Sequence, residues 1–117
     1  MNKQELLERT KKFAHDCVKI AISLPKTKLG LHIHGQLIRC STSVAANYRA
    51  ANVAQSRAAF IAKLSIVIEE ADESEFWLEF AKEENLLSDD LLNPLIKEAH
   101  ELTSIFIISR KTMQSKS

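Results

Sequence analysis

Few residues in this chain of 117 amino acids have the types and spacing that catalysis requires. Arg9 and His15 are separated by five residues, a spacing that some helical ribonucleases use, with histidine as general acid and base and arginine stabilising phosphate charge. The pair lies early in the first predicted helix, and such spacing arises easily by chance. Cys17 and Cys40 stand in apolar helical patterns without a motif for nucleophilic chemistry, which is typical of reduced core thiols. We therefore expect no catalytic residues and no enzyme.

Possible metal ligands are equally incomplete. Glu69, Glu70 and Glu73 suggest a carboxylate site, but a di-iron bundle needs Glu-x-x-His on two helices, and no glutamate stands three residues before a histidine. His32 and His34 diverge when they lie on a helix. The sequence predicts no metal site, no cofactor and no evident small-molecule substrate, since a glycine-rich phosphate loop is also missing.

Charge is distributed unevenly, although the formal net charge is only +1. Residues 1–67 hold eleven Lys and Arg side chains against three acidic ones, and residues 68–117 hold five against twelve. Two interpretations stay open: the basic part binds phosphates, or the two parts neutralise each other within or between subunits. The candidate nucleic-acid-binding residues are the seven cations between Asp16 and Glu69, namely Lys19, Lys26, Lys28, Arg39, Arg49, Arg57 and Lys63.

The elements that must position these residues are helices. Apolar residues recur at steps of three and four, and two glycines and two prolines leave few places to turn. The expected fold is therefore all-α, an antiparallel up-down-up-down four-helix bundle forming a single domain over residues 1–117. The predicted helices cover about residues 3–24, 30–52, 57–85 and 89–113.

The helix ends have recognisable signals. Asn85 is typical of a left-handed residue at a helix C-terminus. The fourth helix starts after Ser88, or else after Asn93 with Pro94 at the first helical position. Gly35 makes the start of the second helix uncertain, because glycine costs about 1 kcal/mol against alanine in a helix.

The sequence contains more apolar residues than four narrow stripes can bury. Three aromatic residues lie beside the buried line of the third helix, and the apolar run 105–108 cannot face one core along its whole length. A wide buried stripe is one explanation. We favour a subunit interface, because monomers rarely expose contiguous apolar patches. The predicted interface residues are Phe76, Trp77, Phe80, Ile105, Ile107 and Ile108.

A polar face is predicted on the second helix. Arg39, Ser43 and Asn47 follow one another at four-residue steps, so they share one side. They could grip phosphates, but we expect Ser43 and Asn47 to form a structural polar network that fixes helix register.

The chain has no segment expected to enter a membrane. No run of 18 apolar residues occurs, and the first residues lack the apolar run of a secretory signal. The expected location is the cytoplasm.

Residues 24–111 resemble a known family. The likeness is carried by the segments LPKTK over 24–28, QLIRCSTSVAANYRAA over 36–51, and FIAKLSI over 60–66 with its continuation to Glu79. These segments are similar to the four-helix-bundle proteins related to the intervening-sequence protein found within large-subunit ribosomal RNA genes of some bacteria. Many members have glutamate where Ala50 stands here, so the contact of that carboxylate is absent or rerouted.

The resemblance implies a ring-like homopentamer with no established enzymatic activity. More distant relatives include accessory proteins of diversity-generating retroelements, which are basic pentamers that work with a reverse transcriptase and nucleic acid. Together with the basic first part of the chain, this favours a non-enzymatic oligomeric bundle that binds RNA or DNA non-specifically through phosphates. The alternative is a structural or protein-interaction scaffold without nucleic-acid binding.

Overall fold

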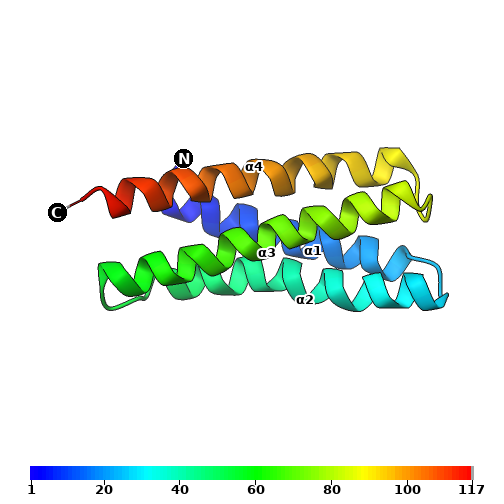
Figure 1. The fold of residues 1–117 in the computed structure, drawn as a ribbon, viewed down its shortest axis with the longest axis horizontal. Helices are drawn as coiled ribbons and strands as arrows, with labels where there is room; N and C mark the ends of the chain where they lie inside the picture. Colours follow the sequence, from blue (N-terminus) through cyan, green and yellow to red (C-terminus); the bar gives the residue numbers. More distant parts are fainter. Residues whose placement is uncertain (117) are drawn as a thin grey trace.

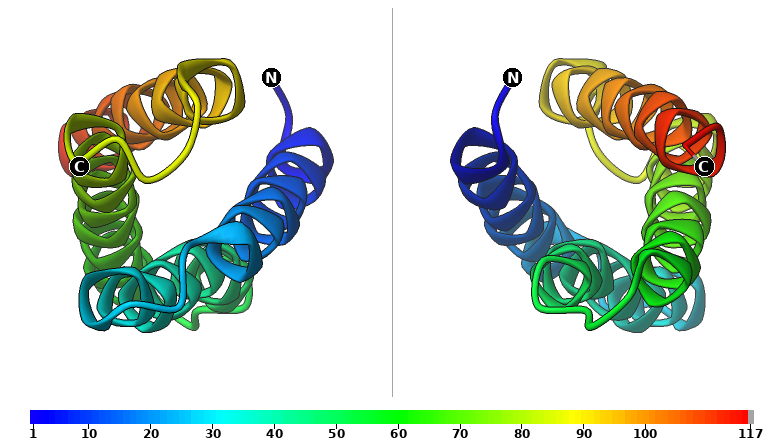
Figure 2. Two further views of the ribbon diagram at one scale, coloured as in Figure 1. Left: turned by 90° about the vertical axis from the view of Figure 1, so that its right-hand side faces the viewer. Right: turned by 90° about the vertical axis from the view of Figure 1, so that its left-hand side faces the viewer.

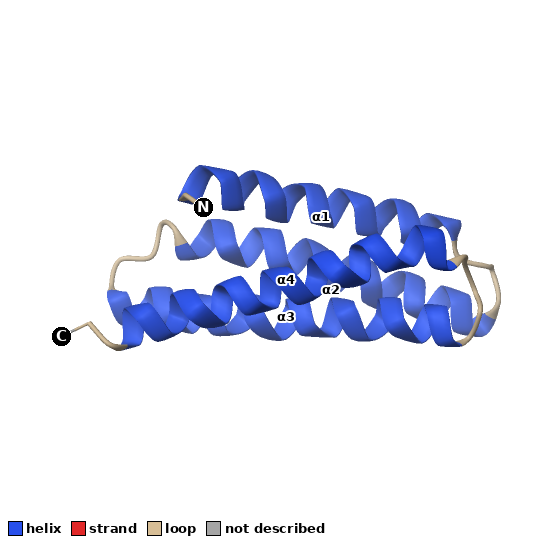
Figure 3. Cartoon of the chain, turned by 90° about the horizontal axis from the view of Figure 1, so that it is seen from above, coloured by secondary structure: helices blue, strands red, loops and turns tan. Residues whose placement is uncertain are grey.

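The structure confirms the predicted bundle. In this computed structural model residues 1–116 are described, and every regular element in that part of the chain is an α-helix. Successive helices run antiparallel in an up-down-up-down order (Figures 1 and 3). The helices are α1 (Lys3–Ser23), α2 (Lys28–Ala51), α3 (Arg57–Glu83) and α4 (Asp89–Gln114).

Capping side chains explain where the helices begin. Asn2 Oδ1 accepts a backbone N–H of the first turn of α1 at 2.8 Å. Thr27 Oγ1 accepts the Gly30 N–H at 3.1 Å, so α2 starts two residues earlier than predicted. Ser88 precedes α4, and Pro94 lies inside that helix rather than at its first position.

The turn between α3 and α4 depends on the left-handed residue predicted from the sequence. Asn85 has a φ of 55°, and it alone among the described non-glycine residues has a positive φ. The Leu86 N–H donates to the Ala81 carbonyl at 2.9 Å, and the Asn85 N–H donates to the Lys82 carbonyl at 3.0 Å. These bonds satisfy the last carbonyls of α3 while the chain reverses.

The two glycines of α2 occupy opposite environments. Gly30 is buried, and a Cβ atom there would collide with the carbonyl oxygen of Pro25 in the α1–α2 loop. Gly35 is exposed, with no heavy atom within 4 Å of the place a Cβ would take. Only Gly30 is therefore required by the packing.

The bundle is a rod of 50 × 20 × 20 Å. Each helix packs along its neighbour in sequence, whereas α1 and α4, which close the bundle, touch each other least (Figure 2, viewed along the rod). Arg9 ties these two helices together. Its guanidinium donates to both Glu98 carboxylate oxygens at 2.7 Å and to Glu101 at 2.9 Å.

One apolar core runs through the bundle. Phe13 and Phe106 are its largest fully buried side chains. Thr10 and Ser74 are buried with them, and each hydroxyl donates to a carbonyl of its own helix. Ser41 is also fully buried, and its hydroxyl has no hydrogen-bond partner among the described residues.

Candidate nucleic-acid interface

The fold turns the uneven charge of the chain into a charge difference between the two ends of the rod. We divide each helix at its midpoint and call residues 1–13, 40–70 and 102–116 the basic end, and residues 14–39 and 71–101 the acidic end. Both termini and the α2–α3 loop lie at the basic end (Figure 1). The basic end carries ten Lys and Arg against four Asp and Glu side chains, and the acidic end carries six against eleven. Formal charge is thus unevenly distributed along the rod, although Arg9 pairs with Glu98 and Glu101, and Arg39 with Glu70, across the dividing line.

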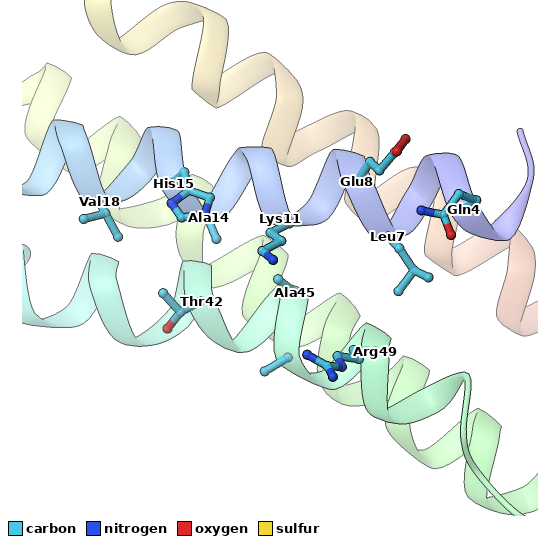
Figure 4. A pocket seen from close by; sticks show the side chains of 11 residues that line it. Gln4, Leu7, Glu8, Lys11, Ala14, His15, Val18, Thr42, Ala45 and Arg49 are labelled. Carbon is cyan, nitrogen blue, oxygen red and sulfur yellow. The ribbon is translucent and has the colours of Figure 1, made fainter.

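A surface groove of about 730 Å³ lies between α1 and α2, mostly at the basic end. In the close view of Figure 4, Lys11 of α1 and Arg49 of α2 point into the groove, whereas Glu8 points away from α2. Two cations from different helices therefore line one concave, partly apolar site, together with Glu8 at its edge. Small and apolar side chains form most of its walls, namely Leu7, Ala14, Val18, Thr42, Ala45 and Ala46.

The groove cations are available to an anion. Among residues 1–116, neither Lys11 nor Arg49 takes part in an ion pair, and both side chains are exposed. His15 lines the same groove one turn beyond Lys11. A guanidinium fork and an ammonium on facing helices supply the charge-assisted donors that bind a phosphate.

Arg39 is not available in this way. It donates to Glu70 at 3.0 Å and also to Glu73, so it forms an ion pair between α2 and α3. Glu73 also accepts the Trp77 indole N–H at 3.0 Å. Burial raises the pKa of Glu73, but the hydrogen bonds from Arg39 and Trp77 outweigh burial and hold the pKa below its ordinary value. Arg39 therefore joins two helices, and we do not assign it to phosphate.

The other predicted cations do not form one surface. Arg49, Arg57 and Lys63 lie at the basic end, where Arg57 donates to the backbone carbonyl of Lys116. The remaining three lie toward the opposite end of the rod, and they are Lys19, Lys26 and Lys28.

Several cations of the basic end were missed by the sequence analysis. They belong to the start of α1 and to the end of α4, which are distant in sequence but lie at the same end of an antiparallel bundle. Counting charge by position in the bundle, rather than along the chain, would have found them. They are Lys3, Lys11, Lys12, Arg110, Lys111 and Lys116.

The Arg9 and His15 pair is separated by the fold. Arg9 is held by Glu98 and Glu101 on the α4 side of α1. His15 lines the groove on the α2 side. The spacing therefore does not bring an acid–base group and a phosphate clamp together within this chain.

The six predicted interface residues fall into two groups. Phe76 is 51% exposed at the acidic end, and Ile108 is 65% exposed at the basic end. The other four are partly buried and pack against the core, as expected for a wide buried stripe, the alternative to a subunit interface. They are Trp77, Phe80, Ile105 and Ile107.

Ser43 and Asn47 bond to each other within α2. The Asn47 amide donates to the Ser43 carbonyl at 3.0 Å and to its hydroxyl at 2.8 Å. Both residues are partly exposed, and in the described residues these bonds reach no second helix. Their geometry stiffens one turn of α2.

The thiols and possible ligands offer no reactive centre in the described residues. Cys17 and Cys40 are free and buried, and burial raises the pKa of the Cys40 thiol to about 11. Within residues 1–116 no three His, Cys, Asp or Glu side chains are grouped so that they could hold a metal ion. None of the described helices combines the length and apolar character needed to cross a membrane.

Comparison with known proteins places the fold and the family. The structure is similar to a crystallised protein of unknown function from the S23 ribosomal protein family of Bacteroides thetaiotaomicron, with 30% identity and a TM-score of 0.86 over 95% of this chain and 99% of that chain. No curated protein matches the chain. The family profile of the 23S rRNA-intervening sequence proteins matches residues 2–107, which include all of α1, α2 and α3 and most of α4. The resemblance inferred from the sequence is confirmed, and the chain belongs to the 23S rRNA-intervening sequence protein family.

Proposed function

We propose that this protein is a non-enzymatic bundle that binds RNA or DNA through backbone phosphates at its basic end. The observation that carries the proposal is the α1–α2 groove, which Lys11 of α1 and Arg49 of α2 both line without an ion-pair partner among the described residues. The excess of positive charge around it attracts a polyanion and orients its approach.

The groove favours binding without base specificity. No aromatic residue other than His15 lines it, so bases have little surface on which to stack. Its two cations suit phosphate oxygens, which carry no sequence information, whereas the Thr42 hydroxyl already donates to the Ile38 carbonyl at 2.6 Å.

We further propose that copies of the chain assemble into a homopentamer, as the family resemblance implies. Ile108 supports an apolar contact at the basic end, because covering its exposed side chain would remove apolar surface from water. Repetition of one weak phosphate site around a ring raises avidity without any change in the site itself. Native mass spectrometry of protein purified without nuclease reports the number of subunits and any retained nucleic acid, and a monomer would contradict the assembly.

The binding proposal is tested with two variants, each of which reverses two positive charges, one at the basic end of the rod and the other at the acidic end. The first variant, Lys11→Glu with Arg49→Glu, reverses the groove cations. The matched control, Lys26→Glu with Lys28→Glu, reverses two exposed cations at the acidic end. Binding of a fluorescently labelled single-stranded RNA and of a DNA duplex is followed by anisotropy over a series of salt concentrations.

We expect wild-type binding to weaken steeply with salt and the groove variant to bind with much lower affinity. In a plot of log affinity against log salt concentration, the slope for the duplex should become shallower by about 0.9 for each phosphate that the variant no longer neutralises. The control should bind nearly as the wild type does. Equally weakened binding in the two variants would show that net charge alone is responsible, and salt-independent binding would contradict the phosphate interaction altogether.

A scaffold without nucleic-acid binding is the second candidate. It is favoured by the ion pairs that Arg9 and Arg39 make with glutamates of the acidic part of the chain, because these pairs neutralise part of the charge within one subunit. Failure of the wild-type protein to bind either nucleic acid at low salt would support this candidate. Dissociation of the oligomer by raised salt at constant pH would then indicate neutralisation between subunits as well.

A further inference from the structure

An aromatic cluster covers part of the surface of α3 at the acidic end. The Phe76 ring lies 4.9 Å from Trp77 and 5.9 Å from Phe80, measured between ring centroids. The His32 ring of α2 stands edge-on to Trp77 at 5.3 Å. Trp77 and Phe80 pack against the core, whereas Phe76 is 51% exposed. The cluster therefore holds an accessible aromatic ring on a rigid base.

Carboxylates surround this ring. Asp72 precedes Phe76 by four residues and Glu79 follows it by three, so both are its neighbours on the surface of α3. Glu69 and Glu83 continue the same side two turns away in each direction. None of these four carboxylates takes part in an ion pair within residues 1–116. Burial raises the pKa of Glu79, and neighbouring carboxylates raise it further, as expected where negative charge is uncompensated.

The charge excludes several occupants of this face. A nucleic acid would bring phosphates against carboxylates. The same face of a second copy would bring two acidic surfaces together, so in a ring only a different, basic part of a neighbouring copy could contact it. A purely apolar partner would bury Asp72 and Glu79 without satisfying them, and burying an unpaired charge is strongly unfavourable. The occupant must therefore carry positive charge.

We propose that the acidic, aromatic face of α3 docks a basic segment of another protein. An arginine or lysine cation of that segment lies over the Phe76 ring, and further cations pair with Asp72 and Glu79. Cations are attracted to the negative face of an aromatic ring, and this attraction strengthens as water is excluded from between them. The face lies outside the groove at the other end of the rod, so the inference does not depend on nucleic-acid binding.

The chain itself offers only short basic stretches for this face. Two adjacent pairs, Lys11 with Lys12 and Arg110 with Lys111, are fixed in helices of the basic end. Another copy could also present the exposed Lys26 of its α1–α2 loop together with Lys28, which is two cations. The row of uncompensated carboxylates favours a longer run of cations from a separate polypeptide, and the sedimentation test below distinguishes this occupant from a second copy.

The test uses Trp77, the only tryptophan of the chain, as its reporter. Its ring touches the cluster, so a cation placed over Phe76 changes its emission. The probe is a ten-residue peptide of alternating arginine and alanine with blocked ends. A second peptide has citrulline for every arginine, which keeps the shape and removes the charge. Isothermal titration calorimetry gives the Kd independently of the fluorescence.

Two variants separate the contributions of the ring and of the charge. Phe76→Leu keeps an apolar side chain but removes the aromatic face, and it should weaken binding of the arginine peptide about fivefold. Asp72→Asn with Glu79→Gln should weaken binding further and flatten its salt dependence. The matched control, Glu84→Gln with Asp90→Asn, removes the same charge from the acidic end away from the cluster, and it should bind as the wild type does.

Three results would overturn the proposal. The first is that the citrulline peptide binds as tightly as the arginine peptide, and the second is that Phe76→Leu binds the arginine peptide as tightly as the wild type does. The third is that the wild type does not bind the arginine peptide even at millimolar concentration. Sedimentation provides the remaining check, because an oligomer that dissociates on Phe76→Ala would show that a second copy covers this face instead.

Discussion

Arg9 determines how firmly α1 is held against α4. Arg9→Met keeps an apolar stem and removes two hydrogen bonds to Glu98 and one to Glu101, at 2.7, 2.7 and 2.9 Å. The side chains of Arg9 and Glu98 are only 24% and 25% exposed, so water screens them partly. Hydrogen bonds to charged groups contribute about 1.5–3 kcal/mol when buried, and exposed ion pairs about 0.2–1 kcal/mol. We expect a loss of about 2 kcal/mol in unfolding free energy, because Glu98 also stays beside the like charge of Glu101.

The matched control is Lys12→Met. It removes the same charge from the same helix, but the Lys12 pair with Asp16 stays within α1, and the Lys12 side chain is 77% exposed. Its expected loss of stability is much smaller than that of Arg9→Met, because water and salt screen an exposed ion pair. Urea unfolding followed by circular dichroism, at one protein concentration, gives both free energies.

Amide hydrogen exchange locates the effect. Arg9→Met should speed exchange along α1 at the α4 side, and Lys12→Met should leave it unchanged. Equal losses of stability in the two variants, or unchanged exchange in Arg9→Met, would show that this ion cluster does not hold α1 in place.

Three further predictions concern single positions and use the same urea titrations. Gly30→Ala should destabilise the bundle by about 2 kcal/mol or more, because the added Cβ meets backbone, whereas Gly35→Ala should stabilise it by about 0.5–1 kcal/mol; similar effects at both positions would contradict the packing of the α1–α2 loop. Ser41→Ala should be neutral or stabilising by up to about 1 kcal/mol, since the buried hydroxyl has no partner among the described residues, and a clear loss of stability would reveal one. Glu73 has a pKa below its ordinary value of 4.5, so its carboxylate stabilises the fold above that pH and the stabilisation is lost as the pH falls through the folded-state pKa. Stability of Glu73→Gln should therefore depend less on pH in that acidic range, and an unchanged pH profile would refute the assignment.

The helices could be predicted from the sequence because their signals are local. Leu64, Val67 and Leu78 follow steps of three and four that place them on one side of a helix, and all three are buried. Asn85 tolerates the left-handed conformation through its own side chain, so the end of α3 could also be inferred.

The candidate sites depend on contacts between distant segments, which local patterns do not contain. Arg39 is isolated from acidic residues along the chain, yet the fold places it against glutamates 31 and 34 residues away. Lys11 and Arg49 are far apart in the sequence, and only the packing of α1 on α2 brings them to one groove. For the apolar run 105–108 in α4, the sequence does not tell which side chains face the core and which face the surface, because this depends on how wide a stripe of α4 is buried.

The opposite charges of the two ends give a nearly neutral molecule a large electric dipole moment. The backbone dipoles of antiparallel helices largely cancel, so this moment comes from the side chains. Near a charged surface such a rod would be oriented before contact, with its basic end toward a polyanion. If both proposals above are correct, the nucleic acid and the basic peptide bind at opposite ends of a rod about 50 Å long, so neither ligand blocks the other. On ion-exchange media near neutral pH, the same property would retain it on resins of either sign.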